Sequence, residues 1–186
     1  ADAKSAQSVF LTKIEATEVG DIQKDAELTQ FAIAGGSAAF KVNCVQCHGS
    51  GSAGSPGYPN LNDDDWIWGG TVDDIYLTLK HGIRYDADED TRFSQMPGFG
   101  VDGILERDAI KDVAWYVRRI SGQEAELEAA ERGAGVYQDN CAACHGAFGQ
   151  GGPGFPVLAD DTWLWSGDPE KIALTIRHGI NANDNS

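Results

Sequence analysis

The clearest pattern of apolar and polar positions along the chain lies in the segment ERDAIKDVAWYVRRIS, residues 106–121. Its apolar side chains recur at intervals of three and four, the spacing of one helix face, at Ile110, Val113, Ala114, Val117 and Ile120. Shorter helices are predicted at 37–47, 73–81 and 168–178, the last two ending before a glycine. Glycine- and proline-rich loops separate these segments, and none of them alternates convincingly like a strand. The pattern predicts an all-α fold.

The second half of the chain repeats the first. Residues 44–84 align with residues 141–181 without a gap, at a constant offset of 97, and 20 of the 41 aligned positions are identical. The identical positions include a C-x-x-C-H motif, a G-x-P-G-x-P loop, a W-x-W motif and a terminal H-G-I. Upstream of this range, further pairs align: Gly36 with Gly133, Phe40 with Tyr137, and Asn43 with Asn140. A period of this length implies two whole domains rather than a solenoid.

The repeat predicts three segments along the chain. Residues 1–33 form an N-terminal helix and linker, residues 34–122 the first domain, and residues 123–186 the second. The acidic stretch SGQEAELEAAER, residues 121–132, separates the two domains. A counterpart of the helix at 106–121 falls beyond residue 186, so the second domain is predicted to lack its C-terminal helix.

Composition narrows the possible partners and shows what must stabilise the fold. The net charge of −15 argues against nucleic acid, whose phosphates require a basic surface, and favours a cationic partner. With 41% hydrophobic residues and 23 glycines, two small domains have thin cores. Such domains need a large internal ligand, metal sites or disulfides. No run of about 18 apolar residues is present that could span a bilayer.

All the cysteines of the chain belong to the two C-x-x-C-H motifs: Cys44, Cys47 and His48, then Cys141, Cys144 and His145. A zinc site needs four ligands, which the two motifs could supply only together. A thioredoxin-like redox pair needs a β-α-β context, which is not predicted. In covalent haem attachment both thiols bond the porphyrin and the histidine binds the iron. Two copies within one duplication favour haem, and the macrocycles supply the missing apolar core.

Met96, the only methionine, lies in the loop FSQMPGFG between two predicted helices. A thioether in such a loop suits a soft axial ligand, and His/Met ligation raises the reduction potential of a haem iron. We therefore predict that His48 and Met96 bind the first iron, rather than that Met96 fills a core. His145 binds the second iron, whose sixth ligand is not assigned because the counterpart of Met96 falls at position 193.

Both motifs, together with PNLNDDDWIWGG, HGIR and SQMPGFG, resemble a known family over essentially the whole chain. The family is the dihaem cytochrome c subunit, subunit III, of cbb3-type cytochrome c oxidases, of which this chain is similar to the periplasmic part. The resemblance implies two tandem class I cytochrome c domains and two haem c groups. It also implies a location on the periplasmic side of the bacterial inner membrane, where an N-terminal segment absent from this sequence anchors the family's domains.

The resemblance further implies electron transfer. The sequence contains no general-base or nucleophile arrangement, so no catalytic residues are assigned. Electrons pass from a donor cytochrome c, expected to be basic, to the monohaem cytochrome c subunit and then to the haem–copper catalytic subunit, which reduces oxygen to water. Two other functions stay open. One is a free periplasmic dihaem carrier, and the other is a dihaem enzyme or sensor with an open second iron.

Several further residues have candidate roles around a haem. The tryptophans of the two W-x-W motifs are expected to wall the haem pockets: Trp66, Trp68, Trp163 and Trp165. Arg84 and Arg92 could pair with haem propionates, since guanidinium binds carboxylate in a bidentate fork. His81 and His178 could bind a propionate or an iron, but the C-terminal end of a helix favours histidine in any case.

Overall fold

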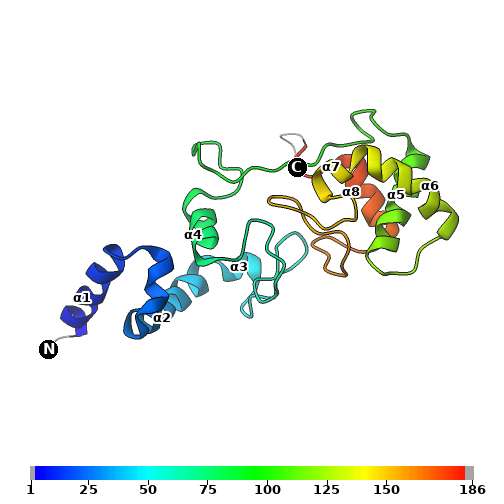
Figure 1. Ribbon diagram of the computed structural model, residues 1–186. Helices are drawn as coiled ribbons and strands as arrows, with labels where there is room; N and C mark the ends of the chain where they lie inside the picture. The colour runs from blue at the N-terminus through cyan, green and yellow to red at the C-terminus, as the bar shows by residue number, and fades with distance from the viewer. Residues whose placement is uncertain (1–2, 183–186) are drawn as a thin grey trace. The chain divides into compact units, whose positions relative to one another are not determined.

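The computed structural model describes residues 3–182, and its regular elements are helices (Figure 1). They are α1 (Ala3–Glu15), the 3-10 helix η1 (Val19–Lys24), α2 (Ala26–Asn43), α3 (Val45–His48), α4 (Val72–His81), α5 (Arg107–Ile120), α6 (Leu127–Asn140), α7 (Ala142–His145) and α8 (Pro169–His178). Across residues 3–182 only isolated β-bridges form, and no strand. The predicted all-α class is confirmed. The outer limits of the predicted segments, residues 1 and 186, lie outside the described residues.

The helices follow the local sequence signals closely. α5 coincides with the predicted helix at 106–121 to within a residue at each end. α8 begins where the carboxylate of Asp168 accepts hydrogen bonds from the backbone N–H groups of Glu170 and Lys171, and Pro169 occupies its first turn. The predicted helix at 37–47 differs in the structure at both ends. α2 begins earlier, because the carboxylate of Asp25 caps its N-terminus by accepting from the N–H groups of Glu27 and Leu28, and it ends at Asn43, so that the last predicted positions lie in α3. None of the helices within residues 3–182 combines the length and the hydropathy needed to cross a membrane.

By packing, the chain divides into two compact units. The first contains the residues up to Asp64 together with Gly70–Lys80, and the second contains Asp65–Gly69 and the residues from His81 onward. The second unit thus takes α5 and the loop of Met96, which precede the boundary at 122/123 that the repeat predicts. Packing and repeat therefore divide the chain at different places.

The core of the second unit lies where α5 packs against α6 and α8 (Figure 1). The predicted apolar stripe of α5 is buried at Ile110, Val113, Ala114 and Val117. Opposite it lie Tyr137 of α6, which is fully buried, and Ile172 and Ile176 of α8. Burial of this stripe, rather than helix propensity alone, stabilises α5 in place.

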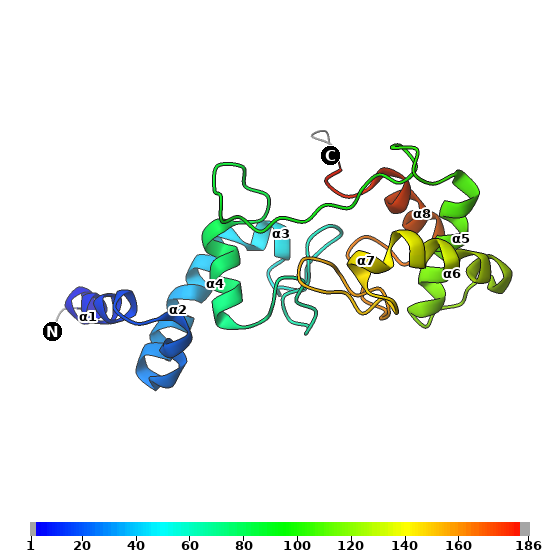
Figure 2. The same cartoon turned by 45° about the horizontal axis from the view of Figure 1, so that its top comes forward.

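The first unit has much less core. Among its described residues the buried hydrophobic side chain is Leu28, near the start of α2. α2 packs against η1 and α1. Between α1 and α2 the rings of Phe10 and Phe31 stack, with their centroids 5.0 Å apart. At its other end α2 leads directly into the short helix α3 (Figure 2).

Candidate functional site

The two C-x-x-C-H motifs have the same backbone conformation. Each starts at a cysteine that ends one helix and begins a four-residue helix, α3 or α7. The N–H of His48 donates to the carbonyl of Cys44 at 2.9 Å, and the N–H of His145 donates to that of Cys141 at 2.9 Å. This single turn holds both thiols and the imidazole of each motif on one short segment, as attachment to one porphyrin edge requires.

A loop that returns to each histidine fixes its ring. Nδ1 of His48 lies 3.0 Å from the carbonyl oxygen of Pro59, and Nδ1 of His145 lies 3.1 Å from that of Pro156. A carbonyl only accepts, so Nδ1 carries the proton and donates in both rings. The lone pair of Nε2 is then available for a metal, with the orientation set by a second hydrogen bond as in known histidine–metal sites. The two prolines end the repeated G-x-P-G-x-P loop, a signal that the sequence contained but did not explain.

The residue after each histidine must reverse the chain. Gly49 has φ 78° and Gly146 has φ 82°, in the left-handed region that favours glycine. The loop then folds back, so that the N–H of Gly54 donates to the carbonyl of His48 and the N–H of Gly151 donates to that of His145. The H-G step of the motif is therefore part of the turn that delivers Pro59 and Pro156 to the imidazoles.

Burial shifts the pKa values of two side chains in the second motif. It lowers the pKa of His145, with the hydrogen bond to Pro156 acting in the opposite direction, so the neutral imidazole that metal binding requires is favoured. Burial, and then the neighbouring Cys144, raise the pKa of Cys141 to about 11. The four cysteines carry free thiols, so no disulfide competes with thioether formation.

Zinc is a poor fit to these cysteines. Each compact unit holds one pair, Cys44 and Cys47 or Cys141 and Cys144. Within residues 3–182 the grouping of metal-ligating side chains consists of His81, Asp88 and Asp90, and it includes no cysteine. A structural zinc site needs four ligands, and neither motif gathers them by itself.

A c-type haem fits the donor set of the second unit better. The buried indole Nε1 of Trp163 has no hydrogen-bond partner among the described side chains and backbone. Trp163 packs against the same core that contains Cys141. A buried N–H without a partner costs about 1–3 kcal/mol, and a haem propionate is the kind of acceptor that removes this cost. Two free thiols, an oriented imidazole and an unsatisfied buried donor thus match what a haem c presents.

Met96 lies in the second unit, with His145, and not in the first unit with His48. Its N–H donates to the carbonyl of Ile180 at 3.0 Å, and the N–H of Ile180 donates back to the carbonyl of Met96 at 3.1 Å. Its side chain is partly buried and packs against the core that includes Cys141. The sequence order of motif and methionine therefore does not match their grouping in space.

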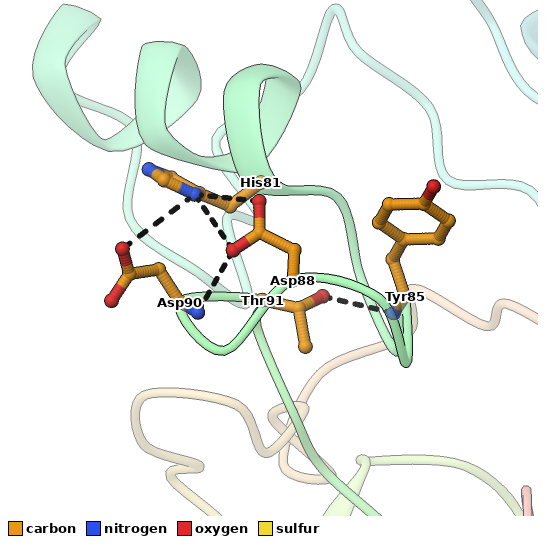
Figure 3. Close-up of polar contacts among 5 residues, drawn as sticks. All are labelled: His81, Tyr85, Asp88, Asp90 and Thr91. Atoms are coloured by element: carbon orange, nitrogen blue, oxygen red, sulfur yellow. Dashed lines mark hydrogen bonds and ion pairs between the residues drawn. The ribbon is translucent and has the colours of Figure 1, made fainter.

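His81, another candidate from the sequence, is engaged locally (Figure 3). Its Nδ1 lies 2.9 and 3.2 Å from the two carboxylate oxygens of Asp88, and 4.0 Å from a carboxylate oxygen of Asp90. The loop is closed further by the N–H of Tyr85, which donates to the hydroxyl of Thr91. No sequence pattern indicated this contact. The equivalent His178 is exposed, so the two histidines do not share an environment.

Comparison with known proteins agrees with this site. A cytochrome c family model matches residues 33–121 and 130–186. The "Cbb3-type cytochrome c oxidase subunit CcoP" of Azospirillum brasilense is 48% identical over 188 residues, covering 96% of this chain and 63% of that protein. The CcoP protein of Cereibacter sphaeroides is 46% identical, covering 91% of this chain and 60% of that protein, and FixPc of Rhizobium leguminosarum bv. viciae is 46% identical, covering 96% and 63%.

The chain spans less than two thirds of the length of these curated relatives. The family match takes in both C-x-x-C-H motifs, and covalently bound c-type haem is the cofactor that cytochrome c domains imply. On this evidence the chain belongs to the cytochrome c family, and its relatives are the CcoP and FixP subunits of cbb3-type cytochrome c oxidases.

Proposed function

We propose that this chain transfers electrons through two haem c groups, one on each C-x-x-C-H motif, as part of a cbb3-type oxidase. The observation that carries the proposal is the repeated arrangement at His48 and His145. In both motifs two free thiols precede an imidazole whose Nδ1 donates to a proline carbonyl. A bound haem c supplies a reversible one-electron change at its iron.

The chain's own residues attach, orient and shield the cofactors. Cys44 and Cys47, and likewise Cys141 and Cys144, form the thioether links, while Nε2 of His48 and of His145 binds iron. Because a hydrogen bond to a proline carbonyl fixes each imidazole, the ring would keep its orientation when the charge of a bound haem changes. Limited rearrangement on a change of charge is what an electron relay needs, because a preorganised polar environment costs little reorganisation.

For the sixth ligand we propose that Met96 binds the iron of His145, in place of the assignment to the iron of His48 that sequence order favours. Two backbone hydrogen bonds between Met96 and Ile180 and the packing of its side chain on the core of Cys141 support this choice. A thioether ligand there would raise the reduction potential of that iron and would leave no position for a diatomic ligand or peroxide. It therefore argues for a relay rather than an enzyme or sensor.

The proposed partners follow from charge and from the relatives. A net charge of −15 suits a basic donor cytochrome c, which long-range attraction steers toward an acidic surface. The names of the relatives, subunits of cbb3-type oxidases, support an association with other oxidase subunits. The proposed route, which the family resemblance implies, leads to a monohaem cytochrome c subunit and from there to the haem–copper catalytic subunit. The proposed location is the periplasmic side of the bacterial inner membrane.

Two measurements on the haem-loaded chain test the proposal. Intact mass after acid acetone extraction should show two haem additions, and replacing Cys44 and Cys47 by alanine should remove one. The rate of reduction by a basic cytochrome c should fall by about tenfold or more as ionic strength rises from 10 to 200 mM, because salt screens the attraction. A protein that retains no haem after extraction contradicts the covalent attachment. A reduction rate that does not change with salt contradicts a basic donor.

A further inference from the structure

Trp68 belongs to the first repeat by sequence and to the second unit by packing. The short segment Asp65–Gly69 packs with the second unit, although the residues before it and after it, up to Asp64 and from Gly70 to Lys80, belong to the first. Trp68 lies in this segment and is partly buried. Trp165, the residue aligned with it in the second repeat, is 54% exposed. The two aligned tryptophans therefore have different surroundings.

The indole of Trp68 lies against the loop that orients His145. A Cβ on Gly154 would come within 2.8 Å of Cη2 and 3.0 Å of Cζ3 of Trp68, so the indole packs directly on the glycine backbone. Beside this contact, the N–H of Gly154 donates to the carbonyl oxygen of Ile67 at 2.8 Å. Two residues further along the loop, the carbonyl of Pro156 accepts the hydrogen bond from Nδ1 of His145. Trp68 thus supports the loop that fixes this imidazole.

The same indole contacts the segment that leads to Met96. The guanidinium carbon of Arg92 lies 5.7 Å from the centroid of the Trp68 ring, within the range of a cation–π contact. Ser94 lies close to the loop itself, since a Cβ on Gly154 would be 3.6 Å from the Cβ of Ser94. Arg92 and Ser94 precede Met96 by four and two residues. Trp68 therefore connects the loop of Gly154 with the segment of Met96.

We propose that Trp68 is a positioning residue of the second haem site, which holds the His145 loop and the Met96 segment at the spacing that two axial ligands of one iron require. This inference rests on the proposed binding of one iron by His145 and Met96. Pro156 and Met96 are 60 residues apart in the chain, so tertiary contacts must set their spacing. A rigid indole is suited to this role, because it offers a large contact area and has few rotatable bonds. A ligand that its supporting residues hold loosely spends more time off the metal.

The test uses the haem-loaded 186-residue chain with Cys44 and Cys47 replaced by alanine, which keeps only the second haem, and imidazole as a competing ligand. Imidazole binds the ferric iron only when the thioether has left it, so its apparent dissociation constant reports the fraction of iron with an open position. Met96→Ala should lower this constant by about a hundredfold and gives the full effect. Trp68→Ala should lower it by about tenfold, and Trp68→Phe by less than about threefold, because phenylalanine keeps an aromatic ring at the contact. Absorbance titration measures each constant.

Two matched controls separate positioning from general loss of packing. Phe93→Ala removes an aromatic ring from the segment between Arg92 and Ser94, but Phe93 is 66% exposed, so the imidazole constant should change by less than about twofold. Gly154→Ala places a methyl group where the indole lies and should act like Trp68→Ala. Gly152→Ala in the same loop meets nothing within 4 Å and should change the constant by less than about twofold.

The outcomes distinguish this inference from the ligation on which it rests. If Met96→Ala lowers the imidazole constant but Trp68→Ala and Gly154→Ala do not, the role of Trp68 is overturned and the ligation by Met96 stands. If Met96→Ala has no effect, the ligation itself is wrong, and the role of Trp68 falls with it. Equal effects of Trp68→Ala and Phe93→Ala also overturn the inference, because they show a general loosening of the segment. Gly154→Ala decides the question if Trp68→Ala does not fold, as circular dichroism would show.

Discussion

Gly133 of α6 lies directly against the backbone of Asp112 in α5, so close that a Cβ there would come within 2.1 Å of the Asp112 carbonyl oxygen. Beside it, the guanidinium of Arg132 donates two hydrogen bonds of 2.8 Å to the Asp112 carboxylate. The crossing of these two helices places the stripe of α5 over Tyr137, four residues before Cys141. α6, which leads directly into the motif at Cys141–His145, is thus held in place by its packing against α5.

The first prediction concerns this crossing. Gly133→Ala should lower the free energy of unfolding of the second unit by about 1–3 kcal/mol, because the two backbones must separate to admit the methyl group. Gly135→Ala on the same helix meets nothing within 4 Å and should raise it by up to about 1 kcal/mol, since alanine favours the helix. Urea unfolding followed by circular dichroism measures both. Equal signs for the two variants contradict the close crossing.

The second prediction separates the two assignments of Met96. In a chain that keeps only the second haem, made by replacing Cys44 and Cys47 with alanine, Met96→Ala should lower the reduction potential on the order of 0.1 V. In a chain that keeps only the first haem, made by replacing Cys141 and Cys144, the same change should have no effect on the potential. Redox titration followed by absorbance decides between them. The reverse result restores the assignment to the iron of His48.

The third prediction concerns the buried N–H of Trp163. If a haem propionate accepts from it, Trp163→Phe should lower the unfolding free energy of the haem-loaded second unit by about 1.5–3 kcal/mol, the usual contribution of a hydrogen bond to a charged group. Trp66→Phe, at the equivalent and partly exposed position, is the control and should change it by less than about 0.5 kcal/mol. A neutral or stabilising effect of Trp163→Phe shows that the indole has no acceptor in the loaded protein.

The fourth prediction concerns His81. Its ring is held by Asp88 at 2.9 Å, with 12% of the His81 side chain and 28% of the Asp88 side chain exposed. A double-mutant cycle with His81→Asn and Asp88→Asn should give a coupling energy of about 0.5–1.5 kcal/mol in urea unfolding. Neither variant should alter the absorption spectrum of either haem. A spectral change on His81→Asn would identify that imidazole as an iron ligand instead.

Features that depend on neighbouring residues could be predicted from the sequence. The stripe of Ile110, Val113, Ala114 and Val117 indicated a helix and its buried face, because a helix with a period of 3.6 turns those positions the same way. Asp168 and Pro169 indicated where α8 begins. The cysteine and histidine spacing indicated haem chemistry, and the structure gives both motifs the same local turn.

Contacts between distant segments could not be predicted in this way. Nothing in the loop after His81 marks Asp88, rather than the nearby Asp86 or Asp90, as the partner of the imidazole. The carbonyls of Pro59 and Pro156 became visible as histidine partners only once the loops were folded, because any residue has a carbonyl group.

By itself the sequence determined the amphipathic helix α5, the start of α8, the two C-x-x-C-H motifs and the duplication, because each depends on spacings of a few residues or on direct identity between the halves. Only the tertiary structure decided which half receives α5 and Met96. The repeat aligns α2 with α6 and α4 with α8, and the aligned helices have equivalent apolar positions. The stripe of α5 is therefore compatible with either pair, α2 and α4 or α6 and α8. Choosing between them depends on the fit of whole surfaces, including the close approach at Gly133, and that fit is a property of the folded chain.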